Sequence, residues 1–339
     1  MTFPQSNAIK GDISFHLQAL AANKKNCASI YLDTTEHESS GGENHHQGLA
    51  RTHKLKDGSI YFFLAHSNIG GGGKLMQFRY DGSTDNEHIQ TTKPLTVAPM
   101  QQKLFLLEEH PSDICFLPDI DNADAGYLFV TEENQMRRLA IYFWRQGEDL
   151  RQLGFITHQF ANVGAKSGPN FLFIDKYRDD YFLGIANSHD EECALYIACD
   201  KELFPADKIG CLNISAFRRT NADVTYSFPV QDSPSQVKLV RNERNEWWLL
   251  AFRSDPSDKE HADDYVDAYP VSFFPVFQIF PRQHSQHIFF PSGDTSFAST
   301  GTHYVESSGR LLVSSSYRWS EEEGPGKSSY VSRIDECPS

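Results

Sequence analysis

One segment pattern recurs five times along the 339-residue chain at nearly constant intervals. Each copy begins with small or polar residues, continues into a short apolar strand, turns through Gly, Asp or Asn, and enters a second, strongly apolar strand. The equivalent positions are 65, 57, 66 and 67 residues apart and fall at Leu49, Ile114, Phe171, Val237 and Tyr304. A repeat of this length built from short strands predicts a radial array of β-sheets.

We therefore expect an all-β fold, a five-bladed β-propeller, with residues 1–339 in a single domain. The blades are expected to start near residues 45, 110, 167, 233 and 299. Because the fifth blade runs out of chain, an N-terminal strand at about residues 27–37 is expected to complete it. This closure would remove two open sheet edges.

The remaining strands of each blade follow from alternating apolar residues and turn signals. In the fourth blade we expect the third strand at residues 273–280 and a solvated loop at residues 255–269, which contain the acidic run EHADDYVDAY. No long window shows apolar residues at helical spacing with capping residues, so helix is expected to be scarce.

Composition limits the possible partners. The formal net charge of -14 argues against a nucleic-acid partner, since such proteins usually carry a basic face. No uncharged apolar stretch is long enough to span a membrane. The N-terminal sequence lacks the features of a secretory leader, so a cytoplasmic location is expected, or export if a leader was removed before numbering. The expected partner is a small-molecule substrate or ligand, and the oligomeric state is left open.

The six cysteines show no C-x-x-C pair and no metal-ligand spacing, and most are expected to be small buried side chains. Cys27 and Cys337 lie near the two chain termini, where the ring must close. A disulfide between them is one alternative that the sequence leaves open.

The geometry of a propeller predicts where polar side chains gather. The start of each innermost strand lies on the same face as the end of the second strand, so these positions surround one mouth of the central channel. Most of the residues there can carry a proton or a hydrogen bond, which predicts a polar funnel at the axis. We expect His46 and His110 to act as general acid and base there, with Glu132 as the orienting or proton-accepting carboxylate.

The expected substrate-binding residues come from the same strand ends. Arg253 and Arg318 have forked donors that suit a carboxylate, enolate or phosphate. A salt bridge on the rim is the alternative for both, and each histidine could equally link neighbouring blades by hydrogen bonds. The full expected set is Gln47, His66, Asn170, His189, Gln236, Arg253, His303, Tyr317 and Arg318.

No cofactor is expected, because the sequence contains no dinucleotide signature and no local metal motif. The alternative is a transition metal held at the axis by histidines, since neutral imidazole is a good ligand for zinc, iron or copper. The candidate ligands would be His45, His46, His66, His110 and His303.

The motifs HHQGLAR from His45, HPSDI from His110 and THYVESSGRLLV from Thr302 resemble inner-strand motifs of uncharacterised β-propeller proteins with an H-x-Q-G type first blade. This resemblance implies the fold and the number of blades, and it brings no activity with it. In shape the chain is similar to the five-bladed arabinanase-like glycoside hydrolases. They need two axial carboxyl groups, whereas here Asp113 and Glu132 both come from one blade.

Three functional hypotheses follow. The first is an enzyme that acts on a small molecule in the axial pocket by cofactor-free acid/base chemistry of the lyase, isomerase or cyclase type. The second is a non-catalytic ligand- or carbohydrate-binding propeller, or a glycoside hydrolase. The third is an interaction scaffold.

Overall fold

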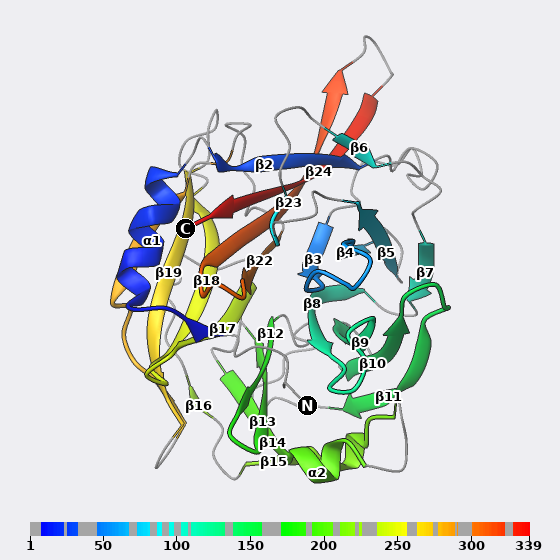
Figure 1. The fold of residues 1–339 in the computed structure, drawn as a ribbon, viewed down its shortest axis with the longest axis vertical. Coiled ribbons are helices and arrows are strands. Elements are labelled where there is room, and N and C mark those ends of the chain that lie inside the picture. Colours follow the sequence, from blue (N-terminus) through cyan, green and yellow to red (C-terminus); the bar gives the residue numbers. More distant parts are fainter. Residues whose placement is uncertain are drawn as a thin grey trace.

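The computed structural model describes residues 8–23, 26–32, 46–67, 73–81, 87–89, 95–97, 103–107, 110–132, 138–157, 171–187, 192–205, 211–220, 224–225, 236–255, 263–273, 277–288, 290, 300–322 and 328–339. In these residues five separate sheets surround a common axis (Figure 1). The innermost strands pack side by side in a closed ring in the order β3, β8, β12, β17 and β22, and β22 meets β3 again. The chain is a five-bladed β-propeller, as the repeat predicts.

The first three blades each run outwards from the axis in sequence order. Blade 1 contains β3 (His46–Arg51), β4 (Ile60–Ser67), β5 (Gly73–Tyr80) and β7 (Lys103–Leu107). Blade 2 contains β8 (Pro111–Pro118), β9 (Ala125–Glu132), β10 (Arg138–Arg145) and β11 (Arg151–Thr157). Blade 3 contains β12 (Phe171–Tyr177), β13 (Asp180–Asn187), β14 (Glu192–Cys199), β15 (Arg218–Arg219) and β16 (Val224–Thr225).

The fourth and fifth blades include strands from elsewhere in the chain. Blade 4 contains β17 (Gln236–Asn242), β18 (Trp247–Asp255), β19 (Asp263–Ser272), β20 (Gln278–Ile279), β21 (His284–Ile288) and the short β1 (Ala8–Ile9), which pairs in parallel with β17. Blade 5 contains β22 (Thr300–Val305), β23 (Leu311–Glu322), β24 (Ser328–Pro338), β2 (Ala28–Leu32) and β6 (Leu95–Val97). The N-terminal β2 pairs antiparallel with β24, which confirms the predicted closure; residues 33–37 of that prediction lie outside the described residues.

The hydrophobic core is divided among the contacts between blades. One buried cluster lies between blades 1 and 2, where the rings of Phe63, Phe116 and Trp144 pack together. Each of the other four contacts between neighbouring blades has a comparable cluster. Burial of these apolar faces is what drives the sheets together, since each blade alone would expose both of its faces.

Gly48 permits a close approach near the axis. A Cβ atom at this position would lie 2.8 Å from Cα of Asp113 and 2.9 Å from N of Ile114, in the neighbouring inner strand. Only glycine allows two backbones to approach so closely. Close packing against the neighbouring inner strand therefore explains the glycine of the first-blade H-x-Q-G motif.

The prediction for the third strand of blade 4, residues 273–280, was wrong. That strand is β19, which lies in the segment expected to be a solvated acidic loop. The buried acidic side chains have partners: Asp267 accepts from Arg253 Nε at 2.8 Å and from Arg282 Nη1 at 3.0 Å, and Asp264 accepts from Ser254 Oγ at 2.5 Å. Paired carboxylates can be buried in a strand, and composition alone does not reveal the pairing.

Helices are few in the described part of the chain, but one was missed. Helix α1 (Ile13–Ala22) packs its residues Ile13, Leu17 and Leu20 into the cluster between blades 4 and 5, and Asp12 caps it by accepting from Ser14 N at 2.8 Å. The short α2 (Asp200–Leu203) and a 3₁₀ turn at Ile214–Ala216 lie beside blade 3. No helix among the described residues is both long and apolar enough to span a bilayer.

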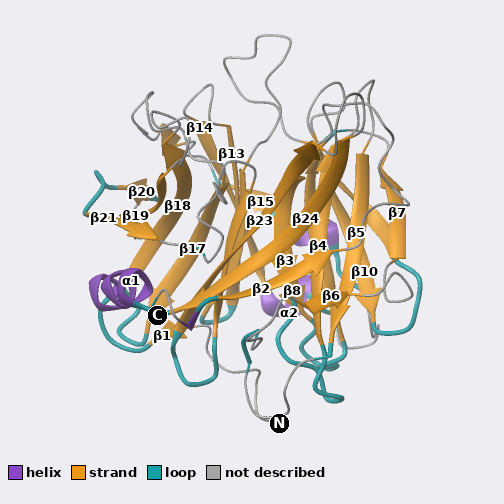
Figure 2. Cartoon of the chain, turned by 90° about the horizontal axis from the view of Figure 1, so that it is seen from above, coloured by secondary structure: helices purple, strands orange, loops and turns teal. Residues whose placement is uncertain are grey.

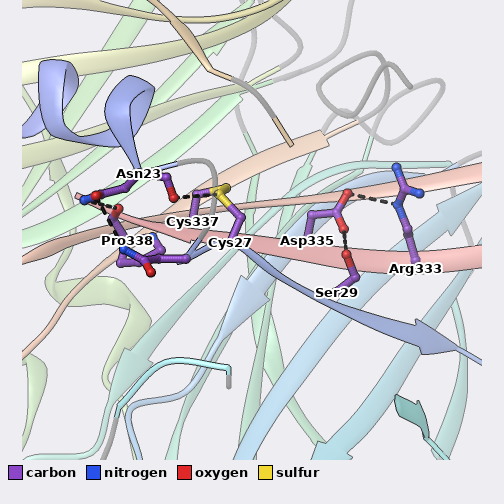
Figure 3. Close-up of a disulfide and its surroundings, with 8 residues drawn as sticks. Asn23, Cys27, Ser29, Arg333, Asp335, Cys337 and Pro338 are labelled. Atoms are coloured by element: carbon purple, nitrogen blue, oxygen red, sulfur yellow. Dashed lines mark hydrogen bonds and ion pairs between the residues drawn. A yellow bond between two sulfur atoms is a disulfide. The ribbon is translucent and has the colours of Figure 1, made fainter. Parts of the chain in front are cut away.

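The structure joins Cys27 to Cys337 by a disulfide, at the junction of β2 and β24 (Figure 3). The same junction is held by Ser29, which donates to Asp335 at 2.5 Å, and by Asn23, which donates to the carbonyl of Pro338 at 3.4 Å. Arg333 in turn forms an ion pair with Asp335 at 2.9 Å. The two ends of the chain are thus fastened to each other across the last blade.

Replacing both Cys27 and Cys337 by serine is expected to lower the free energy of unfolding by about 2–5 kcal/mol, because the disulfide closes a loop over nearly the whole chain in the unfolded state. Denaturant unfolding with and without reductant measures this loss. The Cys199→Ser variant, which removes a free half-buried thiol, is the matched control. Equal stability of the double variant and the control would contradict the closure role.

Candidate functional site

The axis of the ring has two ends, which differ in chemistry. We call the end at the first residues of the inner strands the upper mouth, and the end at their last residues the lower mouth. The hairpin turns that connect inner strands to second strands lie on the lower side of Figure 2. The sequence predicts a site at the upper mouth.

Gln236 crosses the axis near the upper mouth. Its Nε2 donates to the carbonyl of Gln47 and, at 3.2 Å, to the carbonyl of Ser112, while its Oε1 accepts from Gly301 N at 3.0 Å. This one buried side chain of β17 thereby joins blades 1, 2 and 5 to blade 4. These hydrogen bonds use both ends of the Gln236 amide to hold the ring together. They favour a structural role over the expected role in substrate binding.

The expected catalytic histidines lie on neighbouring inner-strand starts. His46 is fully buried, contacts Ser316 Oγ through Nδ1 at 3.1 Å, and lies 5.8 Å from the His66 ring, measured between centroids. His110 is half-buried, and its Nε2 lies 3.5 Å from Gln47 Nε2. The contacts of His46 and His110 therefore link blades, and their catalytic role stays a prediction.

Two of the charged residues expected in the funnel, Glu132 and Arg253, have ion-pair partners. Glu132 pairs with Arg138 Nε at 2.5 Å, and the Arg138 guanidinium lies 3.8 Å from the centroid of the Phe155 ring. Arg253 pairs with Asp267 at 2.8 Å. Both arginines therefore brace β-sheets.

Several expected residues cannot be placed. Asn170, His189 and His45 lie outside the described residues, and the side chains of Tyr317 and Arg318, in β23, are also outside them. Among the described residues, no group of three or more His, Cys, Asp or Glu side chains has a metal-binding arrangement.

A buried ion pair occupies the middle of the axis. Lys238 of β17 is 3% exposed and Asp113 of β8 is 0% exposed, and Lys238 Nζ donates to Asp113 Oδ1 at 2.5 Å. The same ammonium lies 3.2 Å from the carbonyl oxygens of both Ile114 and Leu172 and 3.4 Å from Cys115 Sγ. One lysine therefore ties blades 2, 3 and 4 together at the axis.

The Asp113 carboxylate is equally well satisfied. Its Oδ1 also accepts from Ile114 N at 2.7 Å, and its Oδ2 accepts from Leu172 N at 2.9 Å. Burial raises the pKa of Asp113 to about 6, against the opposing effects of Lys238 and the backbone donors. Burial lowers the pKa of Lys238, but the Asp113 carboxylate outweighs it and leaves that pKa above its ordinary value. We take the pair as ionised at neutral pH.

A cavity of about 820 Å³ lies along the axis from this ion pair towards the lower mouth. Lys238 and Cys115 line its inner end, and the later residues of the inner strands form its walls. These wall residues include Asp175 of β12 together with Thr302, His303 and Tyr304 of β22. Of the expected site residues that the structure describes, His303 is the one that lines this cavity. The sequence therefore predicted an axial site but favoured the opposite mouth.

Asp175 and His303 have strongly shifted pKa values. Burial raises the pKa of Asp175 to about 7, although the Lys176 backbone N–H and the Arg241 charge oppose the shift. Burial, together with the Lys238 charge, lowers the pKa of His303 to about 3. At neutral pH the cavity thus holds a neutral imidazole and a carboxyl group that can gain or lose a proton.

The other reactive groups in the cavity are inactive as nucleophiles. Burial raises the pKa of the Cys115 thiol to about 11, so a thiolate is disfavoured. Lys238 stays an ammonium and already has four acceptors. Burial also lowers the pKa of His53, the second imidazole of the wall. Asp175 is thus the cavity group whose pKa is shifted to about 7, which suits proton exchange near neutral pH.

Sequence reasoning missed Asp175 and Lys238, although a signal for both exists. Each is a charged residue inside an otherwise apolar inner strand, in the segments FIDK and VKLV. A charge in such a position must find a partner or shift its pKa. Asp113, in SDIC, shows the same pattern.

No family model matches the sequence, and no curated protein matches it either. Among solved structures, the chain is similar to a periplasmic gluconolactonase of Pseudomonas aeruginosa, at 15% identity and a TM-score of 0.39 over 76% of this chain and 59% of the other. It is also similar to an α-L-arabinofuranosidase of Podospora anserina in complex with cellotriose, at 9% identity and a TM-score of 0.48 over 93% and 98% of the two chains. A third is a GH43_1 enzyme of Xanthomonas citri, at 9% identity and a TM-score of 0.44 over 96% and 93%. At such identities and TM-scores these likenesses carry no argument about activity.

The axial ion pair gives a stability prediction. Lys238→Met leaves Asp113 buried without its cation and is expected to cost about 3–5 kcal/mol, with a similar loss for Asp113→Asn. Because each variant removes the same interaction, the double variant should lose about 1–3 kcal/mol less than the sum of the two. Denaturant unfolding of all four proteins measures the coupling.

The matched control is the partly exposed pair of Lys176 and Asp200, at 2.6 Å, whose coupling should be below about 1 kcal/mol. Strict additivity at the axial pair would contradict its role as the link between blades.

Proposed function

We propose that this protein is an enzyme that binds a small molecule in the axial cavity and acts on it by cofactor-free acid/base chemistry. The observation that carries the proposal is Asp175, a carboxyl group in a cavity wall with a pKa of about 7. A general acid or base works best when its pKa lies near the operating pH. This retains the reaction class expected from the sequence and moves it to different residues.

The roles of the cavity residues follow from their protonation states. Asp175 takes a proton from the bound molecule or donates one to it. His303, neutral at physiological pH, can accept or donate one hydrogen bond and can orient the molecule without charging. One carboxyl group that removes a proton and returns it suits an isomerisation or an elimination better than a reaction that needs a covalent intermediate.

The cavity is closed at its inner end and is lined partly by apolar atoms, which supports this chemistry. The inner end is sealed by the Lys238–Asp113 pair and, above it, by Gln236. Apolar atoms of Phe116, Phe173 and Leu239 form part of the wall. A proton transfer at Asp175 would therefore occur in a low-dielectric site that is reached from the lower mouth.

A simple binding propeller is the second candidate. The volume of about 820 Å³ is in the range of ligand pockets and would serve binding as well as catalysis. The shifted pKa of Asp175 favours the enzyme, since binding alone does not require a group that titrates near neutral pH.

We also infer an oxidising compartment for the folded protein. The support is the disulfide between Cys27 and Cys337, since such bonds persist in exported proteins and are rare in the cytoplasm. This favours export, the alternative to the cytoplasmic expectation.

The function is tested by incubating the purified protein with a fractionated metabolite pool and following each compound by mass spectrometry. The wild type is expected to consume a compound that Asp175→Asn consumes about 100-fold more slowly or not at all. Asp179→Asn is the matched control, because Asp179 is exposed on the hairpin that follows the same strand and does not line the cavity.

A His110→Gln variant separates the two mouths. Loss of turnover in His110→Gln with full turnover in Asp175→Asn would move the site to the upper mouth and contradict the proposal. Retention of an unchanged compound by the wild type would favour the binding propeller instead.

A further inference from the structure

The cationic side chains around the axial cavity have ion-pair partners, whereas its carboxyl groups form no ion pair with a described residue. Three cationic side chains line it, and each forms an ion pair: Arg51 with Glu336, Lys56 with Asp124 at 3.3 Å, and Lys238 with Asp113. None of these three carboxylate partners is among the lining residues. The positive charges of the wall are therefore already paired with carboxylates that do not line the cavity.

The carboxyl groups of the wall differ in this respect. Asp119, Asp121 and Asp175 line the cavity, and none of the three forms an ion pair with a described residue. Asp119 accepts only from Asp121 N at 2.8 Å and from the Tyr127 hydroxyl at 3.3 Å, and Asp175 accepts from Lys176 N at 2.7 Å. The wall thus has an excess of acceptors and of negative charge.

A buried polar atom of β22 is also without a partner among the described residues. Nδ1 of His303 is shielded from solvent and makes no hydrogen bond with a described residue. Thr302, which is 6% exposed, lines the cavity beside it. Buried polar groups are normally satisfied, so the free imidazole nitrogen indicates a ligand that offers a hydrogen bond.

From this arrangement we propose that the axial cavity takes an organic cation, a small molecule that carries a protonated amine. The proposal rests on the function proposed above, since it names the substrate class of the same cavity. An ammonium group brings donors to a wall of acceptors and compensates carboxyl groups that lack a cation. The size of the cavity and its aromatic walls, Phe116, Phe173 and Tyr304, fit an organic molecule better than a bare ion.

The proposal links binding to protonation of Asp175. The charged or titratable groups around this carboxyl come from several elements: Arg241, whose charge acts on it, Tyr181 of β13, and the cavity-lining His53, Cys115, Asp119, Asp121, Lys238, His303 and Tyr304. Burial raises the pKa of the Cys115 thiol and of both phenols, which are therefore neutral at physiological pH. Burial lowers the pKa of both imidazoles. Asp175 is the group whose pKa burial brings to about 7.

A cation is bound best when Asp175 is ionised. Since the pKa of Asp175 is about 7, its ionised fraction rises as the pH goes from 6 to 8. The affinity for a cation should therefore rise about tenfold over that range, and binding at pH 7 should release about half a proton per protein molecule.

The experiment compares three probes of equal chain length: putrescine, butanediol and succinate. They carry two cationic, two neutral and two anionic ends, respectively. Titration calorimetry on the full chain at pH 6, 7 and 8 should show binding of putrescine alone, about tenfold tighter at pH 8 than at pH 6. Asp175→Asn should weaken this binding about tenfold at pH 8 and remove its pH dependence, while Asp179→Asn should match the wild type.

The other outcomes are equally informative. Binding of butanediol or succinate as tightly as putrescine, or no binding of putrescine, would overturn the cation proposal. The proposed function would survive that result if Asp175→Asn still lost turnover in the metabolite assay. Full turnover by Asp175→Asn would overturn the proposed function, whichever probe binds.

Discussion

The buried ion pair of Lys238 and Asp113 is the interaction on which the rest of the axial architecture depends. Moving two charges out of water is costly, and the cost is offset here because both groups have several further hydrogen-bond partners from neighbouring inner strands. The pair joins blades 2, 3 and 4 where their strands converge. It also separates the two ends of the axis: Gln236 closes the upper side, and a cavity remains on the lower side.

Ring closure is the second constraint. A propeller is stable only if the last blade meets the first, and here β2 completes blade 5 while the disulfide of Cys27 and Cys337 fastens it. Arg51 of blade 1 forms a buried ion pair with Glu336 of blade 5 at the same seam. Glu336 also accepts from Ile89 N at 2.9 Å, so residues beyond β5 add to the closure. The cavity keeps its shape because both the axis and the seam are fixed.

The sequence predicted the fold well because the repeat reports strand order directly. The inner and second strands were placed by their apolar runs, and β2 was identified by the need to complete blade 5. Prediction failed where burial contradicts composition: β19 carries acidic residues whose arginine partners, Arg253 and Arg282, are distant in sequence. The predicted catalytic residues His46, His110 and Glu132 do not line the axial cavity, for a related reason. Polar residues at strand ends are easy to see, whereas Asp175 and Lys238 are single charges within apolar strands. Only the assembled ring creates the burial that raises the pKa of Asp175 and brings Asp113 to Lys238, whose pKa that carboxylate raises.

The claim that most of this account depends on is that the cavity contains a carboxyl group that titrates near neutral pH. Carboxyl ¹³C NMR of aspartate-labelled protein, with Asp175→Asn to assign the signal, measures this directly. The account predicts a titration midpoint for Asp175 of about 7. A midpoint near the ordinary aspartate value of about 4 would contradict it, since the cavity would then lack its proton-exchanging group.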